Sequence, residues 1–156
     1  MYDVKNIRVY LASPWFNDEQ AEREDRIKKK LKELGFDVWS PKDNCVCSPI
    51  ADEKMRKKVF SDNCCNINLA DVVFAITDGK DMGTIWEAGY AYGLNVSRHE
   101  NPIKIVYYCE TLGTNGQFNL MLAQSGDIVI MKYEELDKLP ELIKKGKRLA
   151  YAGIVE

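Results

Sequence analysis

The sequence predicts an α/β fold: a doubly wound, five-stranded parallel sheet of the flavodoxin-like type, with strand order 2-1-3-4-5. Short apolar runs alternate with longer amphipathic segments along the whole chain. The run at residues 72–76 is apolar at every position, which is typical of a strand covered by helices on both faces. With 156 residues and no repeat or linker, the chain is expected to form a single domain over residues 1–156.

The first apolar run, residues 7–12, ends at a Ser-Pro turn and is expected to be the first strand. Residues 19–34 then predict a helix, because apolar side chains recur at i, i+4 and i+7 between charged ones. Gly35 fits the C-terminal stop of this helix. The short run at residues 36–39 predicts the second strand.

A polar loop is expected at residues 40–52, where Pro, Asp, Asn, Ser and Cys are concentrated. A second helix is expected at residues 53–69, with Met55 and Val59 facing inward. The buried third strand follows at residues 72–76.

The second half of the chain continues the alternation of strand and helix. The remaining helices are expected at residues 84–97, 118–125 and 133–145, and the remaining strands at residues 103–108 and 128–130. A Gly/Thr/Asn loop at residues 111–117 follows the fourth strand.

Composition excludes several classes of function. Lys plus Arg number 22 and Asp plus Glu 24, so the net charge of −2 offers no basic excess for nucleic acid. No apolar run is long enough to span a membrane, and no signal peptide is visible, so a cytoplasmic location is expected. The five cysteines are odd in number and lack zinc-knuckle spacing, so no disulfide framework is expected, and a metal site is expected only if the fold brings the pairs Cys45/Cys47 and Cys64/Cys65 together. No cofactor is expected either.

The predicted strand order brings the loop after the first strand opposite the loop after the third. Ligands of open α/β sheets bind in such a crevice at the carboxyl ends of the strands. Tyr10, Phe16, Asp81 and Glu87 are therefore expected near one another, with Gly83 allowing close approach. Paired carboxylates there suggest attack on the anomeric carbon of a sugar.

Glu87 has two competing interpretations. Thr84-Ile-Trp-Glu87 matches a capping box, in which Glu87 would bond its own helix terminus. As a nucleophile, Glu87 would instead be kept ionised by the helix dipole. Asp81 is either a turn residue or a carboxylate that orients substrate, and the two like charges would raise one of the two pKa values.

Aromatic residues surround the predicted crevice. Trp15 and Phe16 either stack on a planar base or pack structurally. Their loop lacks the Gly-rich backbone that cradles phosphate, which favours a nucleoside over a nucleotide. The Tyr10 hydroxyl either donates to a catalytic carboxylate or belongs to an ordinary core tyrosine.

Taken together, these segments resemble the nucleoside 2-deoxyribosyltransferase family. The strongest piece is Asp-Met-Gly-Thr-Ile-Trp-Glu at residues 81–87, and the pieces follow in family order through nearly the whole chain. The matching segments are residues 9–16, 41–44, 70–71, 81–91, 119–121 and 151–156. The resemblance implies reversible transfer of 2-deoxyribose between a deoxynucleoside and a free nucleobase.

The resemblance also implies roles for particular residues. Glu87 is similar to the family nucleophile, which forms a covalent deoxyribosyl-enzyme that a second base attacks with net retention. Asp81 resembles the residue that holds the sugar near its hydroxyls. Tyr10 resembles the tyrosine that bonds the nucleophile, and Phe16 resembles the wall of the base pocket.

Sharing of sites between subunits is a further implication of the resemblance. In this family the Asn-Leu-Met segment comes from a neighbouring subunit, so Asn119 and Met121 would complete an adjoining site. The family's C-terminal carboxylate also reaches the pocket, which suggests a role for Glu156. A homo-oligomer, either a dimer or a trimer of dimers, would follow.

Two departures from the family pattern concern the base. The base-handling aspartate of the family aligns with Asn63, next to Asp62. Either Asp62 takes the role of the family's aspartate, or the Asn63 side-chain amide, which offers both a donor and an acceptor, recognises the base. Cys45 stands where the family has a polar side chain.

Two other functions remain open from the sequence. An N-glycoside hydrolase of deoxynucleosides or their monophosphates would use the same Glu87 but pass the sugar to water. The apolar Pro14-Trp15-Phe16 loop argues against a 5′-phosphate site for such an enzyme. The non-enzymatic alternative is a nucleotide-sensing module of the same fold.

Overall fold

The computed structural model describes residues 2–113 and 116–156 and contains a five-stranded, wholly parallel sheet of order β2-β1-β3-β4-β5. The predicted fold class and strand order are therefore confirmed. The strands are β1 (Arg8–Ala12), β2 (Asp37–Trp39), β3 (Val72–Ile76), β4 (Lys104–Tyr108) and β5 (Ile128–Ile130). In the register, Tyr10 lies between Trp39 of β2 and Val73 of β3.

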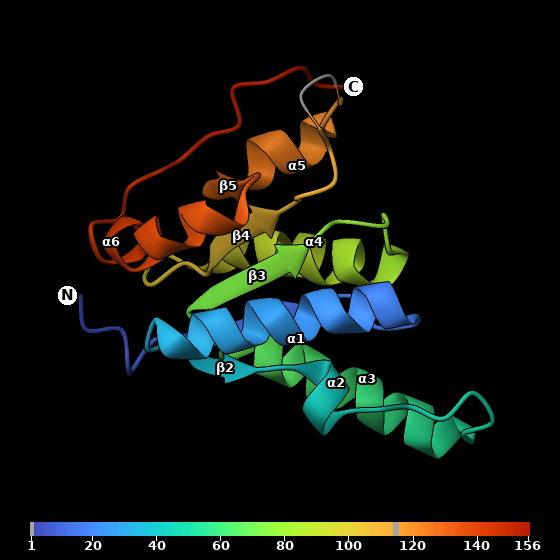
Figure 1. Ribbon diagram of the computed structural model, residues 1–156. Helices are drawn as coiled ribbons and strands as arrows, with labels where there is room; N and C mark the ends of the chain where they lie inside the picture. Colours follow the sequence, from blue (N-terminus) through green and yellow to red (C-terminus); the bar gives the residue numbers. More distant parts are fainter. Residues whose placement is uncertain (1, 114–115) are drawn as a thin grey trace.

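Helices cover both faces of the sheet, as Figure 1 shows. One face carries α1 (Asp18–Glu33), the 3-10 helix η1 (Tyr133–Lys138) and α6 (Leu139–Lys144). The other face carries α3 (Glu53–Asn68), α4 (Met82–Ser97) and α5 (Leu120–Ser125). Alternate residues of each strand feed the two cores, and every residue of β3 is buried, as its apolar run predicts.

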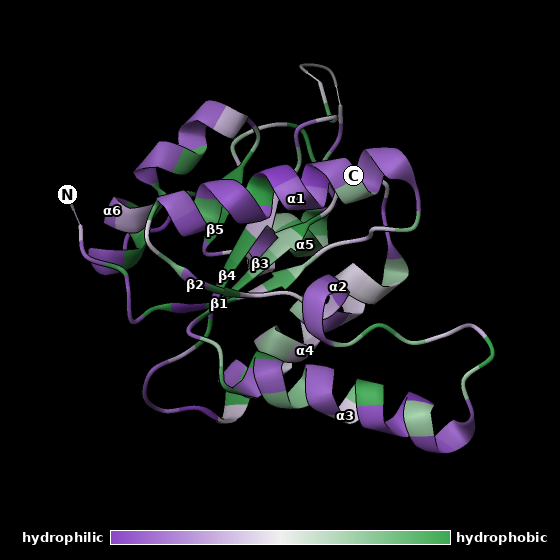
Figure 2. Ribbon diagram, turned by 60° about the horizontal axis from the view of Figure 1, so that its bottom comes forward, coloured by the Kyte–Doolittle hydropathy of each residue, from purple (hydrophilic) through white to green (hydrophobic). Residues whose placement is uncertain are grey.

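Local signals explain where α1 begins and ends. The Asn17 side chain accepts a hydrogen bond from the Gln20 amide, and two acidic residues occupy the first turn. Gly35 has φ +98°, which ends the helix as expected. The outer face of α1 is strongly hydrophilic, whereas α4 is coloured mostly white to green (Figure 2).

Several expected boundaries were wrong, each for a local reason. The loop at residues 40–52 contains the short helix α2 (Pro41–Asn44), which Pro41 starts at its first turn. The helix expected at residues 118–125 begins only at Leu120, because Asn119 caps it. The helix expected at residues 133–145 divides into η1 and α6, because Pro140 has no N–H to continue a regular helix.

The first half of α3 also differs from expectation. Met55, expected to face inward, is exposed, because the N-terminal turns of α3 extend past the sheet and have no core beneath them. Only Ile67, near the other end of the helix, is fully buried. No helix among residues 2–113 and 116–156 has the length and apolarity needed to cross a membrane.

Candidate active site

A hydrogen bond joins two residues that are 77 positions apart in the sequence. The hydroxyl of Tyr10, on β1, donates to Oε1 of Glu87, on α4, at 2.6 Å. Tyr10 is fully buried, and its ring stacks on Trp39 of β2 with centroids 5.1 Å apart. The pairing of β1 with both β2 and β3 thus fixes the hydroxyl that holds the Glu87 carboxylate.

Glu87 does not cap its helix. The cap of α4 is Asp81, whose Oδ2 accepts from the Thr84 amide at 2.7 Å and from the Thr84 hydroxyl at 2.9 Å. A Cβ at Gly83 would lie 3.2 Å from this oxygen, so glycine keeps the cap uncrowded. The capping-box interpretation of Thr84 and Glu87 is therefore wrong, and Glu87 is available for chemistry.

Burial, with a smaller contribution from the negative charge of Asp81, raises the pKa of Glu87 to about 7. The hydrogen bond from Tyr10 acts in the opposite direction and favours the carboxylate. The helix dipole was expected to keep Glu87 ionised, but desolvation is the largest contribution at this partly enclosed position and raises the pKa. The expected repulsion between the two carboxylates is present as a smaller effect.

Two cysteines lie near the Tyr10 hydroxyl, where their charged forms would oppose its ionisation. One is Cys45, whose thiol pKa is raised by burial and by Asp62. The other is Cys64 of α3, whose pKa is raised by burial and by Glu87. Reasoning from the sequence named Cys45 but missed Cys64, and it missed the stacking of Trp39. The predicted strand order, which places the second strand beside Tyr10, contained the signal for Trp39.

Asp62 and Asn63 point in different directions from α3. The Asp62 carboxylate accepts a bond from the ammonium of Lys58 and is partly exposed. Asn63 Oδ1 is buried and has no hydrogen-bond partner among the described residues. A buried polar atom without a partner costs free energy. Asn63 therefore carries an unpaired acceptor, whereas the Asp62 carboxylate is paired with Lys58.

The loop after β1 does face the loop after β3. A Cβ at Gly79 would lie 3.2 Å from the side-chain nitrogen of Gln20. Trp15 is half-buried and Phe16 is 73% exposed, and their ring centroids lie 5.5 Å apart. This aromatic pair lies on the loop after β1 and is not part of either core cluster.

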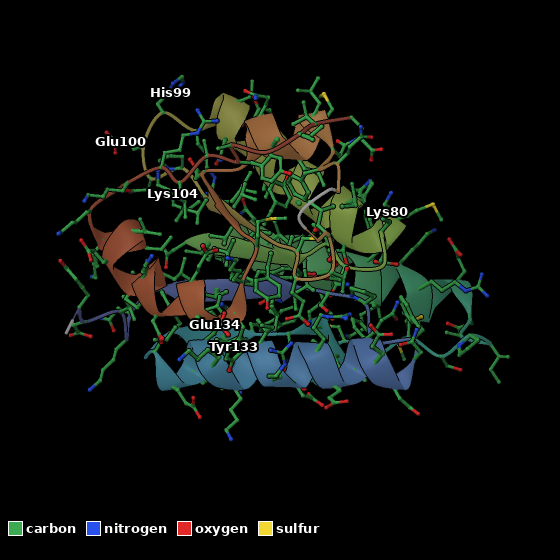
Figure 3. The ribbon with its side chains drawn as sticks, turned by 45° about the horizontal axis from the view of Figure 1, so that its top comes forward. Lys80, His99, Glu100, Lys104, Tyr133 and Glu134 are labelled. Carbon is green, nitrogen blue, oxygen red and sulfur yellow. The ribbon has the colours of Figure 1, made fainter. Side chains whose placement is uncertain are left out.

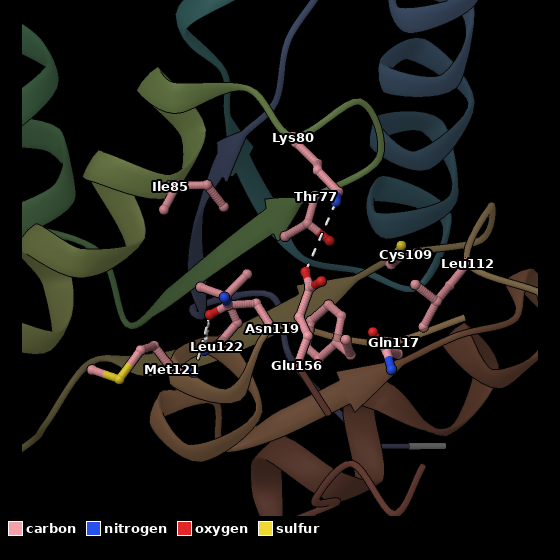
Figure 4. A pocket seen from close by; sticks show the side chains of 11 residues that line it. Thr77, Lys80, Ile85, Cys109, Leu112, Gln117, Asn119, Met121, Leu122 and Glu156 are labelled. Atoms are coloured by element: carbon pink, nitrogen blue, oxygen red, sulfur yellow. Dashed lines mark hydrogen bonds and ion pairs between the residues drawn. The ribbon is translucent and has the colours of Figure 1, made fainter. Parts of the chain in front are cut away.

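The residues expected to serve an adjoining site gather around a different cavity, of about 280 Å³ (Figure 4). Asn119, Met121 and Glu156 line it, whereas Tyr10 and Glu87 do not. Asn119 caps α5 through the amides of Met121 and Leu122. Backbone bonds between Glu156 and the start of α5 hold the C-terminal segment there, and the Glu156 carboxylate lies 3.8 Å from the Lys80 ammonium.

No metal-binding cluster of three or more His, Cys, Asp or Glu side chains occurs in the described part of the chain. All five cysteines are free thiols. The single histidine, His99, is exposed on the loop after α4, far from Lys80 at the crevice (Figure 3).

Asp78 has a larger role than the simple turn that its Asp-Gly dipeptide suggests. Its buried carboxylate accepts from the amides of Glu110 at 3.0 Å and Thr111 at 2.8 Å, so it ties the end of β3 to the end of β4. We expect Asp78→Ala to lower the free energy of unfolding by about 1–3 kcal/mol, because two partly buried amides lose their acceptor. Urea unfolding measures this, with the exposed Asp137→Ala as a control that stays within about 0.5 kcal/mol of the parent. An unchanged midpoint for Asp78→Ala would contradict the proposed tie.

Comparisons with known proteins agree with this geometry. The family model described as nucleoside 2-deoxyribosyltransferase matches residues 9–134. Among solved structures, a 2-deoxyribosyltransferase from the psychrotolerant bacterium Bacillus psychrosaccharolyticus is 26% identical, with a TM-score of 0.75 over 92% of this chain and 98% of that chain. A conserved protein from Enterococcus faecalis V583 is 20% identical and shares the fold, with a TM-score of 0.67 over 90% of this chain and 98% of that chain. A search of curated proteins found no match.

The family match spans β1 to the start of η1 and includes Tyr10, Asp81 and Glu87. The order of the strands that position these three residues is the one predicted from the alternation of strands and helices in the sequence. This chain belongs to the nucleoside 2-deoxyribosyltransferase family of enzymes.

Proposed function

We propose that this protein transfers 2-deoxyribose from a deoxynucleoside to a free nucleobase through a covalent deoxyribosyl-Glu87 intermediate, with net retention. The observation that carries the proposal is the Glu87 carboxylate, held at one oxygen by Tyr10 and free of any capping role. A pKa of about 7 leaves a large ionised fraction of Glu87 near neutral pH. A carboxylate whose pKa is far below 7 is a weaker nucleophile, because its negative charge is more strongly stabilised.

The reaction has two displacements at one carbon. First, a Glu87 oxygen bonds to C1′ of the sugar while the bond from C1′ to the base nitrogen breaks, and the base leaves with the electron pair. Next, a nitrogen of the incoming base bonds to C1′ from the face that the first base left and gives up its proton to solvent, while the bond from C1′ to Glu87 breaks. The departed base takes one proton from solvent in exchange, so the overall reaction is neutral. The carboxylate is regenerated, and two inversions give retention.

Tyr10 and Asp81 have supporting roles in this scheme. The Tyr10 hydroxyl fixes Oε1 of Glu87, so the second oxygen is directed at the sugar. Asp81 uses Oδ2 for its cap, and no described residue donates to Oδ1, which leaves that atom for a sugar hydroxyl. A carboxylate acceptor at this place would orient the sugar relative to the attacking oxygen.

The base is proposed to lie between the aromatic pair and α3. Trp15 and Phe16 would supply stacking surface, while Asn63 and Cys45 would contact the polar edge of the base. An amide cannot protonate a departing base, so Asn63 would bind and orient the base without acting as an acid.

We also propose that the enzyme is a homo-oligomer, a dimer or a trimer of dimers. Asn119, Met121 and Glu156 would then complete the site of a neighbouring subunit. These residues line a cavity to which Tyr10 and Glu87 do not contribute, which supports this arrangement.

Incubation of the protein with thymidine or deoxyinosine plus adenine tests the proposed reaction. Chromatography should show deoxyadenosine together with the released thymine or hypoxanthine. Release of free deoxyribose without a new nucleoside would identify a hydrolase instead. Binding of the deoxynucleoside with no turnover would favour a sensing module.

Substitutions at Asn63 test how the base is held. We expect Asn63→Ala to raise KM for the base about 3–10-fold, because one hydrogen bond to the base is lost. Asn63→Asp should add a descending limb to the pH profile of kcat/KM, since the new acid must be protonated to assist the leaving base. Asp62→Ala is the matched control and should change neither quantity. If Asp62→Ala changed KM for the base and the Asn63 variants did not, the result would contradict this placement.

A further inference from the structure

Trp39 lies directly beside the tyrosine that binds Glu87. It is the last residue of β2, which is an edge strand, and the register pairs it with Tyr10 of β1. The two rings stack with centroids 5.1 Å apart and an angle of 25° between their planes. Trp39 therefore supplies a flat surface against the Tyr10 ring.

The other neighbours of the Tyr10 ring offer no such surface. On the opposite side, the register pairs Tyr10 with Val73 of β3, whose side chain is branched and has no flat face. The helix above the sheet, α4, contributes the small side chains of Ala88 and Ala91 to the same buried cluster. Strand pairing thus fixes the backbone of Tyr10, whereas the stack with Trp39 sets the tilt of the ring.

The tilt matters because the hydroxyl lies at the far end of the ring. That hydroxyl donates to Oε1 of Glu87 at 2.6 Å. Catalytic groups need to be held within about 0.5 Å and 10–20° of their productive geometry by neighbours that lock their side chains. A ring that could tilt further would lengthen or break the bond, and the second oxygen of Glu87 would lose its direction.

The core alone does not account for a tryptophan at this place. The Trp39 side chain is only partly buried and packs against the margin of the cluster that contains Tyr10. A leucine at the end of an edge strand could cover the same margin, but it would give the Tyr10 ring no flat face. The stack, rather than burial, therefore explains the aromatic side chain.

We infer that Trp39 is a positioning residue: its indole ring holds the Tyr10 ring at the tilt at which the hydroxyl binds Glu87. Trp39 acts through Tyr10 and has no chemical step of its own. The inference rests on the proposed function for what the Glu87 carboxylate does. The coupling of Trp39 to the bond between Tyr10 and Glu87 can be measured without any reaction.

A double-mutant cycle tests this coupling in the base-exchange assay. Trp39→Leu should lower kcat/KM about 5–10-fold in the parent protein, because the Tyr10 hydroxyl is misplaced. In the Tyr10→Phe background, Trp39→Leu should change kcat/KM less than about 2-fold, because the ring has no hydroxyl left to position. Trp39→Phe keeps a flat ring and should retain at least about half of the parent value. A purely structural Trp39 would cause the same loss in both backgrounds.

Titration of Glu87 without substrate tests the same coupling independently of activity. Carbon-13 NMR of the carboxyl groups gives the Glu87 pKa in the four proteins of the cycle, with the signal assigned by its absence in Glu87→Gln. Water admitted by the smaller leucine lowers this pKa in both backgrounds, whereas a weakened Tyr10 bond raises it in the parent background only. The change in pKa caused by Trp39→Leu should therefore be at least about 0.5 pH units more positive in the parent than in the Tyr10→Phe background.

Tyr133→Leu is the matched control, because it removes a partly exposed aromatic ring on the opposite face of the sheet, where Arg26 lies over it. It should change neither the rate nor the Glu87 pKa. Trp39→Met, which also lacks a flat face, replaces Trp39→Leu if far-UV circular dichroism shows that the leucine variant does not fold.

Equal changes of the Glu87 pKa in the two backgrounds would overturn the inference. If the parent protein shows no base exchange, the proposed function fails, and the titration still decides whether Trp39 controls the bond between Tyr10 and Glu87.

Discussion

Glu87→Gln should reduce base exchange by about 10³-fold or more, since an amide oxygen cannot form the glycosyl ester that the reaction requires. The side chain keeps its shape and can still accept the Tyr10 hydroxyl, so the loss would reflect chemistry rather than misfolding. Initial rates of deoxyadenosine formation from thymidine and adenine measure the effect. Glu134→Gln makes the same substitution at an exposed position of η1 and should have parent activity.

The same substitution should stabilise the protein at alkaline pH. Burial raises the pKa of Glu87 from about 4.5 to about 7, so the folded state holds its proton more tightly than the unfolded state does. Stability is therefore lost as the pH rises from about 4.5 through 7, by up to about 3 kcal/mol for a shift of this size. Glu87→Gln removes this loss, so we expect it to be more stable than the parent by about 1–3 kcal/mol at pH 8 and by less than about 1 kcal/mol at pH 5.

Urea unfolding at the two pH values measures this difference. Increased stability at pH 8 together with abolished exchange would fit a carboxylate that is costly to bury and necessary for catalysis. Equal stability of Glu87→Gln and the parent at both pH values would contradict the description of Glu87 as a desolvated acid.

Tyr10→Phe should move the pH dependence of the reaction upward. For the parent, kcat/KM should rise with pH through about 7, because Glu87 must be ionised to attack. The Tyr10 hydrogen bond favours the carboxylate, and a bond to a charged group is worth about 1.5–3 kcal/mol. Its removal should therefore shift the ascending limb upward by about 1–2 pH units and lower kcat/KM at neutral pH about 10–100-fold.

The matched control is Tyr107→Phe, which removes the hydroxyl of another buried tyrosine of the sheet. That hydroxyl pairs with Ser125 at 3.0 Å, so its loss should leave the ascending limb in place. Rate profiles between pH 5 and 9 for the three proteins provide the comparison. An unchanged limb in Tyr10→Phe would show that the bond does not control the ionisation of Glu87.

The topology was predictable because it depends on local sequence patterns, and no tertiary contact changes the type of element that these patterns predict. The uninterrupted apolar run of β3 and the stop at Gly35 needed no tertiary information. Once the strand order followed from the alternation of strands and helices, the meeting of Tyr10 with Glu87 followed from the crevice at the switch point. The contact between Tyr10 and Glu87 was therefore predictable from the topology.

The remaining features depend on contacts that a linear pattern does not contain. Asp81 and Thr84 are both good capping residues, and the local backbone, with φ +52° at Lys80, starts the helix at the earlier of the two. The pKa of Glu87 depends on how much chain covers it, which spacing along one helix does not reveal. Met55 matched the apolar face of a helix, but α3 extends beyond the layer that would have covered it.

The most direct test of the account is intact-protein mass spectrometry after reaction with a slow 2′-fluoro-2′-deoxynucleoside, followed by peptide mapping. The account predicts that one fluorodeoxyribosyl group is added per chain, that the modified peptide carries it on Glu87, and that adenine removes it to give a new nucleoside. An adduct on any other residue, or exchange of this substrate without any adduct, would contradict the assignment of Glu87 as the nucleophile.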